Sequence, residues 1–252
     1  MIREIILENK DIYKGNLILV NEYYPLKKFE INDLKPLEDS DIYLKNDVVD
    51  ILEKIIKKIS AKGKIVYVSG YRSLEEQKNI WNDSIRESGE EFTRKYVAIP
   101  GCSEHHTGLA IDLGLKKEEI DFICPDFPYD GICEEFRKLA CDYGFIERYQ
   151  KEKEEITKIS KEPWHFRYLG YPHSKIIKEK GFCLEEYIDF IKEYDNEKKY
   201  IFKNSKEETF EIYFLPAKKD KTLLQIPEGL NYELSGNNVD GFIITLWGRE
   251  NA

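Results

Sequence analysis

The stretch SEHHTGLAID (residues 103–112) contains side chain types that bind metal ions in proteins. It holds two of the four histidines of the chain, His105 first, and it ends at Asp112. Gly108 permits a tight turn after His105, and the small Ala110 shares a strand face with Asp112, so this face has room for an ion. A catalytic zinc site takes three ligands from His, Asp or Glu and leaves a position open for water. His105 and Asp112 could supply two of the three.

A third candidate ligand is His165, in the aromatic stretch PWHFRYLG (163–170), where its side chain lies on the face opposite Trp164. No HExxH pattern is present, so the common metalloprotease helix is excluded. An isolated His or Asp in a strand is more often structural, and that alternative stays open. We expect His106 to point elsewhere and His173 to lie in a loop or at a helix start.

The elements around these residues can be predicted from spacing. Residues 44–63 form an amphipathic helix, capped by Asn46 or Asp47 and ended by Gly63. A strand follows from residue 64 and ends at Ser69-Gly70.

Ser73 and Glu76 make a capping-box pattern that starts a helix over about 74–88. Arg72 lies at the junction between that strand and this helix, and Gln77 lies in the helix's first turns, where both could point into a cleft. Taken alone, both residues are better explained as solvated surface side chains.

The rest of the chain is predicted to alternate strands and helices up to residue 199 and to form only short strands after it. We expect a short buried strand that leads into a loop over 16–26, and strands over 108–115, 145–149 and 163–170. Helices are expected over 133–144 and 183–199. After residue 199, three or four short strands separated by polar turns indicate a small antiparallel β appendage. The fold class is therefore α+β, with a domain over 1–199 and a β-rich subdomain over 200–252.

Composition excludes several classes of protein. The 252 residues carry 48 acidic and 39 basic side chains, a net charge of -9, and no basic block, which argues against nucleic-acid binding. No apolar run is long enough for a secretory signal or a membrane anchor, so we expect a cytoplasmic protein. The five cysteines show no CxxC spacing and are expected to be reduced thiols.

Three blocks together resemble a known family. The pattern Ser-x-His-x-x-Gly-x-Ala-x-Asp is complete over residues 103–112, SGYRSLEEQ (69–77) lies upstream, and EPWHFRYLG (162–170) lies downstream. These blocks are similar to the zinc D,D-peptidases of vancomycin resistance, the VanX, VanY and VanXY group. That group belongs to the D-Ala-D-Ala carboxypeptidase and hedgehog-like superfamily. The resemblance covers roughly residues 16–195.

The resemblance implies a fold, a cofactor and a set of roles. It implies a hedgehog/D,D-peptidase-like, mainly antiparallel sheet with packed helices, and a Zn²⁺ ion. By this resemblance the metal ligands would be His105, Asp112 and His165. The catalytic residues would be Glu162, as general base, and Arg72, which would stabilise the oxyanion. Gln77, Ser103 and Trp164 would contact the substrate. Core packing explains Trp164 equally well.

In a regular strand Glu162 and His165 would face opposite ways. Pro163, between them, could interrupt the ladder and let both side chains reach the ion.

The absence of an apolar N-terminal segment resembles the bifunctional VanXY type. That type cleaves D-Ala-D-Ala and removes the terminal D-Ala from UDP-muramyl pentapeptide, contributing to vancomycin resistance, without nucleic acid or a membrane anchor. One alternative is a phage-type L-Ala-D-Glu peptidoglycan endopeptidase with a similar zinc site. The other is a non-catalytic zinc-containing binding protein, against which Glu162 argues, because a structural zinc needs no base.

Overall fold

The computed structural model describes residues 2–27, 31 and 33–249. These residues divide into two compact units, one over Val20–Cys183 and one made of Met1–Leu19 with Leu184–Ala252. The division differs from the expected ranges 1–199 and 200–252, because the N-terminal residues and the helix before residue 199 belong with the C-terminal strands. Whether the two ranges are separate folding domains stays a prediction.

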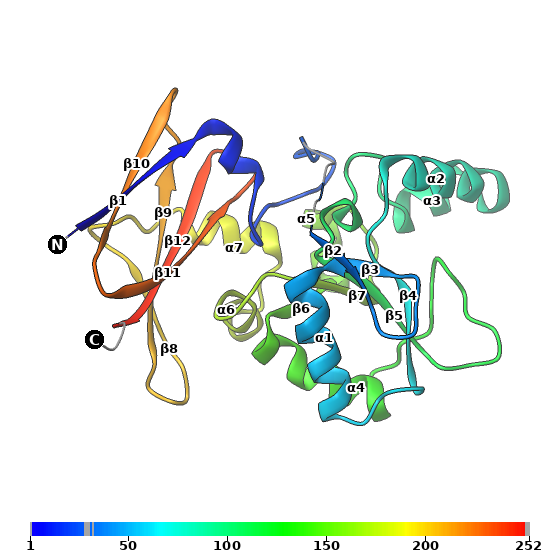
Figure 1. Cartoon of the computed structure of the whole chain (residues 1–252). Helices are drawn as coiled ribbons and strands as arrows, with labels where there is room; N and C mark the ends of the chain where they lie inside the picture. The colour runs from blue at the N-terminus through cyan, green and yellow to red at the C-terminus, as the bar shows by residue number, and fades with distance from the viewer. Residues whose placement is uncertain (1, 28–30, 32, 250–252) are drawn as a thin grey trace. The chain divides into compact units, whose positions relative to one another are not determined.

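The unit over Val20–Cys183 is built on a four-stranded antiparallel sheet in the order β4-β5-β7-β6, as drawn in Figure 1. The sheet strands are β4 (Ile65–Ser69), β5 (Ala110–Leu115), β6 (Phe145–Tyr149) and β7 (Glu162–Tyr168). A small hairpin adds β2 (Leu34–Pro36) and β3 (Tyr43–Lys45). The helices of this unit are α1 (Asn46–Lys58), α2 (Leu74–Ser88), α3 (Glu90–Tyr96), α4 (Gly131–Ala140), α5 (Glu154–Thr157) and α6 (His173–Lys180).

One face of this sheet forms the core with α1 and α4. Ile111 and Leu113 of β5 and Phe166 of β7 pack in one cluster with Leu52 of α1 and Phe136 of α4, and all five are fully buried. Burying such side chains is the main favourable term in folding, at ~25 cal/mol per Å² of apolar surface. Because side chains alternate along a strand, the opposite face of β5 presents Ala110 and Asp112. The expected α+β fold with a mainly antiparallel sheet is confirmed.

The other unit contains α7 (Leu184–Ile191) and the remaining strands. A four-stranded antiparallel sheet has the order β11-β12-β9-β8, and a two-stranded sheet pairs β1 with β10. The strands are β1 (Ile2–Glu8), β8 (Tyr200–Lys203), β9 (Thr209–Pro216), β10 (Lys221–Pro227), β11 (Leu230–Gly236) and β12 (Gly241–Arg249). The C-terminal β structure was expected, although it has five strands from β8 to β12 rather than three or four.

Two local predictions are wrong. Residues 16–26 form no strand: Leu17 to Val20 are buried, but the backbone bonds only at scattered points, such as the Leu19 N–H to the Asn237 carbonyl. Helix α1 has no side-chain cap at its start, and it ends at Lys58 with Ile59 as its C-cap. Ser60 takes a positive φ directly after this end, so Gly63, whose φ is also positive, lies too far along the chain to close the helix. By contrast, the capping box of Ser73 and Glu76 at α2 is present.

All five cysteines lie in the described part of the chain, and none forms a disulfide. None of the helices that the structure describes has both the length and the apolar character that crossing a bilayer requires.

Candidate active site

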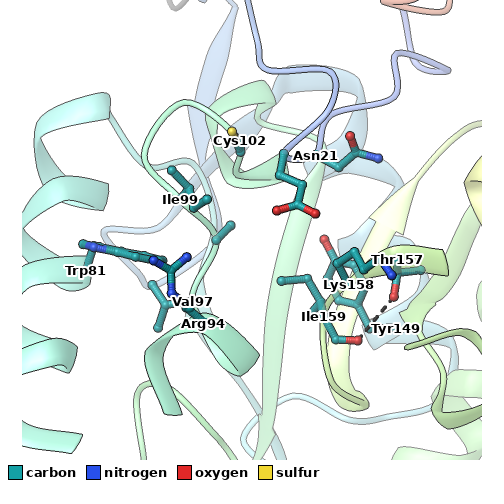
Figure 2. A pocket seen from close by; sticks show the side chains of 12 residues that line it. Asn21, Trp81, Arg94, Val97, Ile99, Cys102, Tyr149, Thr157, Lys158 and Ile159 are labelled. Carbon is teal, nitrogen blue, oxygen red and sulfur yellow. Dashed lines mark hydrogen bonds between the residues drawn. The ribbon is translucent and has the colours of Figure 1, made fainter. Parts of the chain in front are cut away.

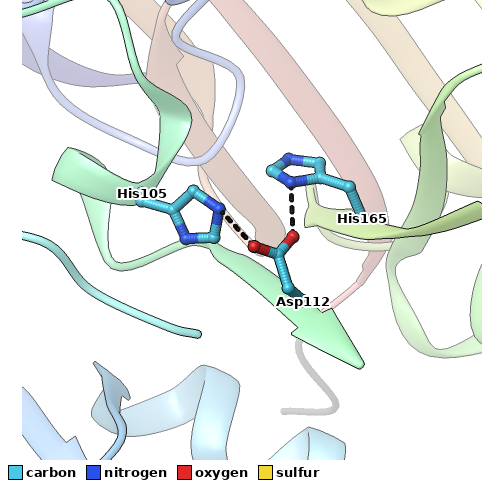
Figure 3. A group of neighbouring side chains, drawn as sticks. All are labelled: His105, Asp112 and His165. Atoms are coloured by element: carbon cyan, nitrogen blue, oxygen red, sulfur yellow. Dashed lines mark hydrogen bonds and ion pairs between the residues drawn. The ribbon is translucent and has the colours of Figure 1, made fainter. Parts of the chain in front are cut away.

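His105, Asp112 and His165 come together as the sequence predicts. Their ligand atoms all lie within 4.8 Å of one another, and the three side chains point toward a common centre in Figure 3. Asp112 and His165 are direct cross-strand partners in β5 and β7. His105 reaches them from the 3₁₀ turn Glu104–Thr107, which Gly108 closes in the left-handed conformation. All three are buried, with exposed fractions of 3%, 4% and 3%.

The hydrogen bonds around this cluster leave one nitrogen of each histidine directed at the centre. His105 Nδ1 lies 2.6 Å from the Gly70 carbonyl, and its Nε2 lies 3.1 Å from Asp112 Oδ2. His165 Nδ1 lies 2.8 Å from Asp112 Oδ1, and its Nε2 lies 3.4 Å from Glu104 Oε2. Metal-binding histidines commonly give their second N–H to a carbonyl or a carboxylate in this way. The donor set therefore fits a divalent cation held by Nε2 of His105, Nδ1 of His165 and the Asp112 carboxylate.

The charge on Asp112 suits a ligand role. Burial opposes its ionisation, but His105 and His165 outweigh burial and hold its pKa well below the usual range. The pKa of His105 is lowered to about 4, by burial first and then by Arg72, so this imidazole is neutral near pH 7. Burial also acts to lower the pKa of His165, but Asp112 raises it to about 9. A cation at the centre would displace that proton, because a ligating nitrogen must be unprotonated.

Glu162 lies beside the three ligands. Its Oε2 is 3.8 Å from His165 Nδ1. The β6–β7 register shifts between Glu147 and Tyr149, so three residues of β7 stand opposite one of β6, and Glu162 and His165 reach the same side. The irregularity expected near Pro163 is present. Burial raises the pKa of Glu162 to about 8, as is common for catalytic carboxyls.

Arg72 is held at the edge of the cluster by three polar contacts. Its Nε donates to Ser69 Oγ at 2.7 Å, one terminal nitrogen donates to Gln77 Oε1 at 3.3 Å, and the other donates to Asp112 Oδ2 at 2.8 Å. Gln77 is fully buried and donates to the Ala98 carbonyl at 2.8 Å. Arg72 thus lies next to the candidate ligands, and Gln77 fixes its position.

A small cavity opens over the cluster. Among the described residues, its lining includes Ser103 and Trp164 but not Gln77. Ser103 also accepts from the His105 N–H at 3.3 Å. Trp164 packs in the core cluster as well, so both interpretations of this residue hold. The roles of Ser103, Gln77 and Trp164 toward a substrate stay predictions.

The two other histidines take no part in the cluster. His106 Nδ1 lies 2.8 Å from the Arg72 carbonyl, and its Nε2 accepts from the Gly101 N–H at 3.1 Å. His173 is buried at the start of α6, as expected for a helix-start residue.

Sequence reasoning missed the carboxylate behind His165. The Glu104 side chain is fully buried, and its Oε1 lies 2.9 Å from Arg148 Nε and 3.0 Å from an Arg167 terminal nitrogen. Burial opposes its ionisation, but the two guanidinium groups outweigh burial and hold its pKa far below the usual range. The available signal was an arginine next to aromatic residues in each of two strands, Arg148 before Tyr149 and Arg167 between Phe166 and Tyr168, since buried cations require a partner.

The fold and the site define a class: a peptidase built on an antiparallel sheet, with a candidate metal site of two histidines and one aspartate. The sequence model of the VanY family, D-alanyl-D-alanine carboxypeptidase, matches residues 41–171. The chain belongs to this family.

Individual relatives agree with this assignment. The bifunctional D-Ala-D-Ala dipeptidase and D-Ala-D-Ala carboxypeptidase VanXYC of Enterococcus gallinarum is 44% identical over 181 residues, 70% of this chain and 95% of that protein. A D-alanyl-D-alanine carboxypeptidase of Enterococcus faecium is 35% identical and aligns with 97% of this chain and 79% of its own length. The crystal structure of the vancomycin resistance D,D-dipeptidase VanXYg, in complex with a D-Ala-D-Ala phosphinate analog, matches with a TM-score of 0.97 and 58% identity. That match covers 98% of this chain and all of VanXYg.

Proposed function

We propose that the chain is a zinc D,D-peptidase that hydrolyses D-Ala-D-Ala and removes the C-terminal D-Ala from UDP-muramyl pentapeptide, and so contributes to vancomycin resistance. The observation that carries this proposal is the meeting of two histidines, an aspartate and the Glu162 carboxyl in one buried pocket. The likeness to VanXYg and VanXYC supports the choice of substrates.

Zinc suits the donor set, because two imidazoles and one carboxylate leave a fourth position open. When bound, zinc would lower the pKa of a water molecule and polarise the scissile carbonyl. His105 and His165 would hold it through the nitrogens that face Asp112, while Gly70 and Glu104 fix the orientations of the two rings.

Glu162 would act first as a base and then as an acid. Its pKa of about 8 belongs to the cluster without a cation, and a cation at the three ligands would lower it again. The ionised carboxylate would then accept the proton of the attacking water. The neutral acid that results would pass this proton to the nitrogen of the departing D-Ala.

Arg72 would stabilise the negative charge that develops on the carbonyl oxygen. Its guanidinium is buried and fixed before reaction, and a preorganised cation in a dry site stabilises such charge better than water does. Ser103 and Trp164, which line the cavity, would contact the substrate, and Gln77 would act by holding Arg72.

The test is D-Ala release by the purified zinc protein from D-Ala-D-Ala and from UDP-muramyl pentapeptide at matched concentrations. We expect release from both, and loss of both on chelation that zinc restores. Digestion of purified peptidoglycan without D-Ala release would indicate an L-Ala-D-Glu endopeptidase instead, and no turnover despite bound zinc would indicate a binding protein. A cytoplasmic location would place the enzyme where these precursors are made, and cell fractionation tests it.

A further inference from the structure

A second, larger cavity adjoins the candidate active site. Its volume is about 180 Å³, against about 30 Å³ for the cavity over the metal ligands. Val97, Ala98, Tyr149 and Ile159 line both cavities, so the two adjoin each other. The Tyr149 ring lies 5.0 Å from the His165 ring, which brings the larger cavity to within one side chain of a candidate ligand.

The lining of the larger cavity combines apolar side chains with charged ones of both signs, including the acidic Glu22. Figure 2 shows Trp81, Arg94 and Ile99 on one side, across from Lys158 and Ile159. Trp81 lies on α2 and Arg94 on α3. Binding sites for organic ligands commonly combine such apolar contact with a few polar groups at defined positions. None of these residues has a part in the proposed chemistry.

The position of the cleaved bond in a peptide substrate indicates which part of the substrate would occupy the larger cavity. A carboxypeptidase releases one C-terminal residue, so every additional residue of a longer substrate lies on the N-terminal, acyl side of the scissile bond. The cavity over the ligands is too small for several residues, and the larger cavity adjoins it.

We propose that the cavity lined by Trp81, Arg94, Ile99, Lys158 and Ile159 binds the acyl part of peptide substrates longer than a dipeptide. This inference rests on the proposed function and adds to it a specificity site separate from the chemistry. D-Ala-D-Ala, which has one residue on the acyl side, does not extend into this cavity. A pentapeptide stem does, with its backbone against Trp81 and its charged groups toward Arg94 and Lys158.

The test is the substitution Trp81→Ala, with kcat and KM measured on both D-Ala-D-Ala and UDP-muramyl pentapeptide. We expect kcat/KM for the pentapeptide to fall about tenfold or more, mainly through KM, because an aromatic contact with the bound chain is lost. Activity on the dipeptide should stay within about twofold, which also shows that fold and zinc are intact. The matched control is Ile85→Ala, an exposed apolar residue on the same helix that does not line the cavity.

A second variant fills the cavity instead of emptying it. Ile99→Trp adds bulk at a position that is 38% exposed, and it should weaken pentapeptide turnover while sparing the dipeptide. Equal losses on both substrates, or no loss on the pentapeptide in either variant, would overturn the assignment. If the unaltered protein cleaves only the dipeptide, the carboxypeptidase part of the proposed function fails before any variant is made.

Discussion

At the scale of single residues, two carboxyl groups contact the same imidazole and are prepared for different tasks. Glu104 faces His165 Nε2, and its carboxylate forms ion pairs with two buried arginines. These ion pairs keep the carboxylate ionised and fixed in position. Glu162 faces Nδ1 in an environment where burial raises its pKa to about 8. When two carboxyl groups in one active site have very different pKa values, one commonly has a supporting role and the other takes part in the reaction. We therefore expect the two positions to respond differently to substitution.

Glu162→Gln should keep zinc and lose turnover by a factor of roughly 10²–10⁴, the usual contribution of a general acid–base group. His165→Ala should lose zinc as well, because a ligand acts in the ground state and a base acts only during reaction. Metal analysis of the two purified variants, alongside kcat, checks the contrast. Equal zinc loss in both would make Glu162 a ligand.

Glu104→Gln should lower zinc affinity by roughly 10- to 100-fold, since the amide orients His165 less well and leaves two arginines without their carboxylate. Competition with a chromophoric chelator measures this affinity directly. Glu147→Gln is the matched control: Glu147 pairs with Arg137 at 2.8 Å in the same sheet but contacts none of the ligands. An unchanged affinity in Glu104→Gln, or the same loss in the control, would refute an orienting role.

At the scale of elements, the patterns that can be predicted are those that a few neighbouring residues determine. Ser73 and Glu76 satisfy each other's backbone N–H groups within one turn, so the start of α2 follows from the sequence alone. The alternation of Ile111, Asp112 and Leu113 likewise fixes which face of β5 is buried and which carries the ligand.

The elements that could not be predicted depend on distant partners. Strand β1 has only the short apolar run Ile5–Leu7 between charged residues, and it is a strand because it pairs with β10, more than 200 residues along the chain. From the sequence alone Glu104 resembles an exposed surface acid, and only the fold shows that Arg148 and Arg167 form ion pairs with it. The helix and strand types around the candidate ligands therefore follow from sequence, whereas the support behind His165 requires the tertiary structure.

Helix α6 should make stability depend on pH, because its first residue, His173, is buried and burial lowers its pKa to about 3. The unfolded chain binds a proton near pH 6.5 and the folded chain does not. Stability is therefore fully present above about pH 6.5 and is lost as the pH falls toward 3, by up to about 1.4 kcal/mol per pH unit. Urea unfolding of the wild type and of His173→Gln between pH 7 and 5 checks this, with a shallower slope expected in the variant. Parallel slopes would contradict it.

At the scale of the whole molecule, every candidate ligand, Glu162 and Arg72 lie within the unit over Val20–Cys183. The relative VanXYC aligns over almost its full length with only 70% of this chain. We expect a protein of residues 20–183 alone to fold, bind zinc and hydrolyse D-Ala-D-Ala, because these residues form a compact unit of their own. Circular dichroism, metal analysis and the dipeptide assay check the three properties. A truncated protein that does not fold would show that the peptidase unit needs the residues removed.

The pairing of β1 with β10 has a consequence for synthesis on the ribosome. Residues 2–8 are translated before the unit over Val20–Cys183, but their partner, Lys221–Pro227, is translated only after it. Domains generally fold in the order in which they are made, so the unit over Val20–Cys183 can close while β1 is still unpaired. During that interval β1 presents an open edge of the kind that promotes aggregation. The charged residues Arg3, Glu4 and Glu8, on either side of Ile5–Leu7, would keep this unpaired segment in solution until β10 has been made.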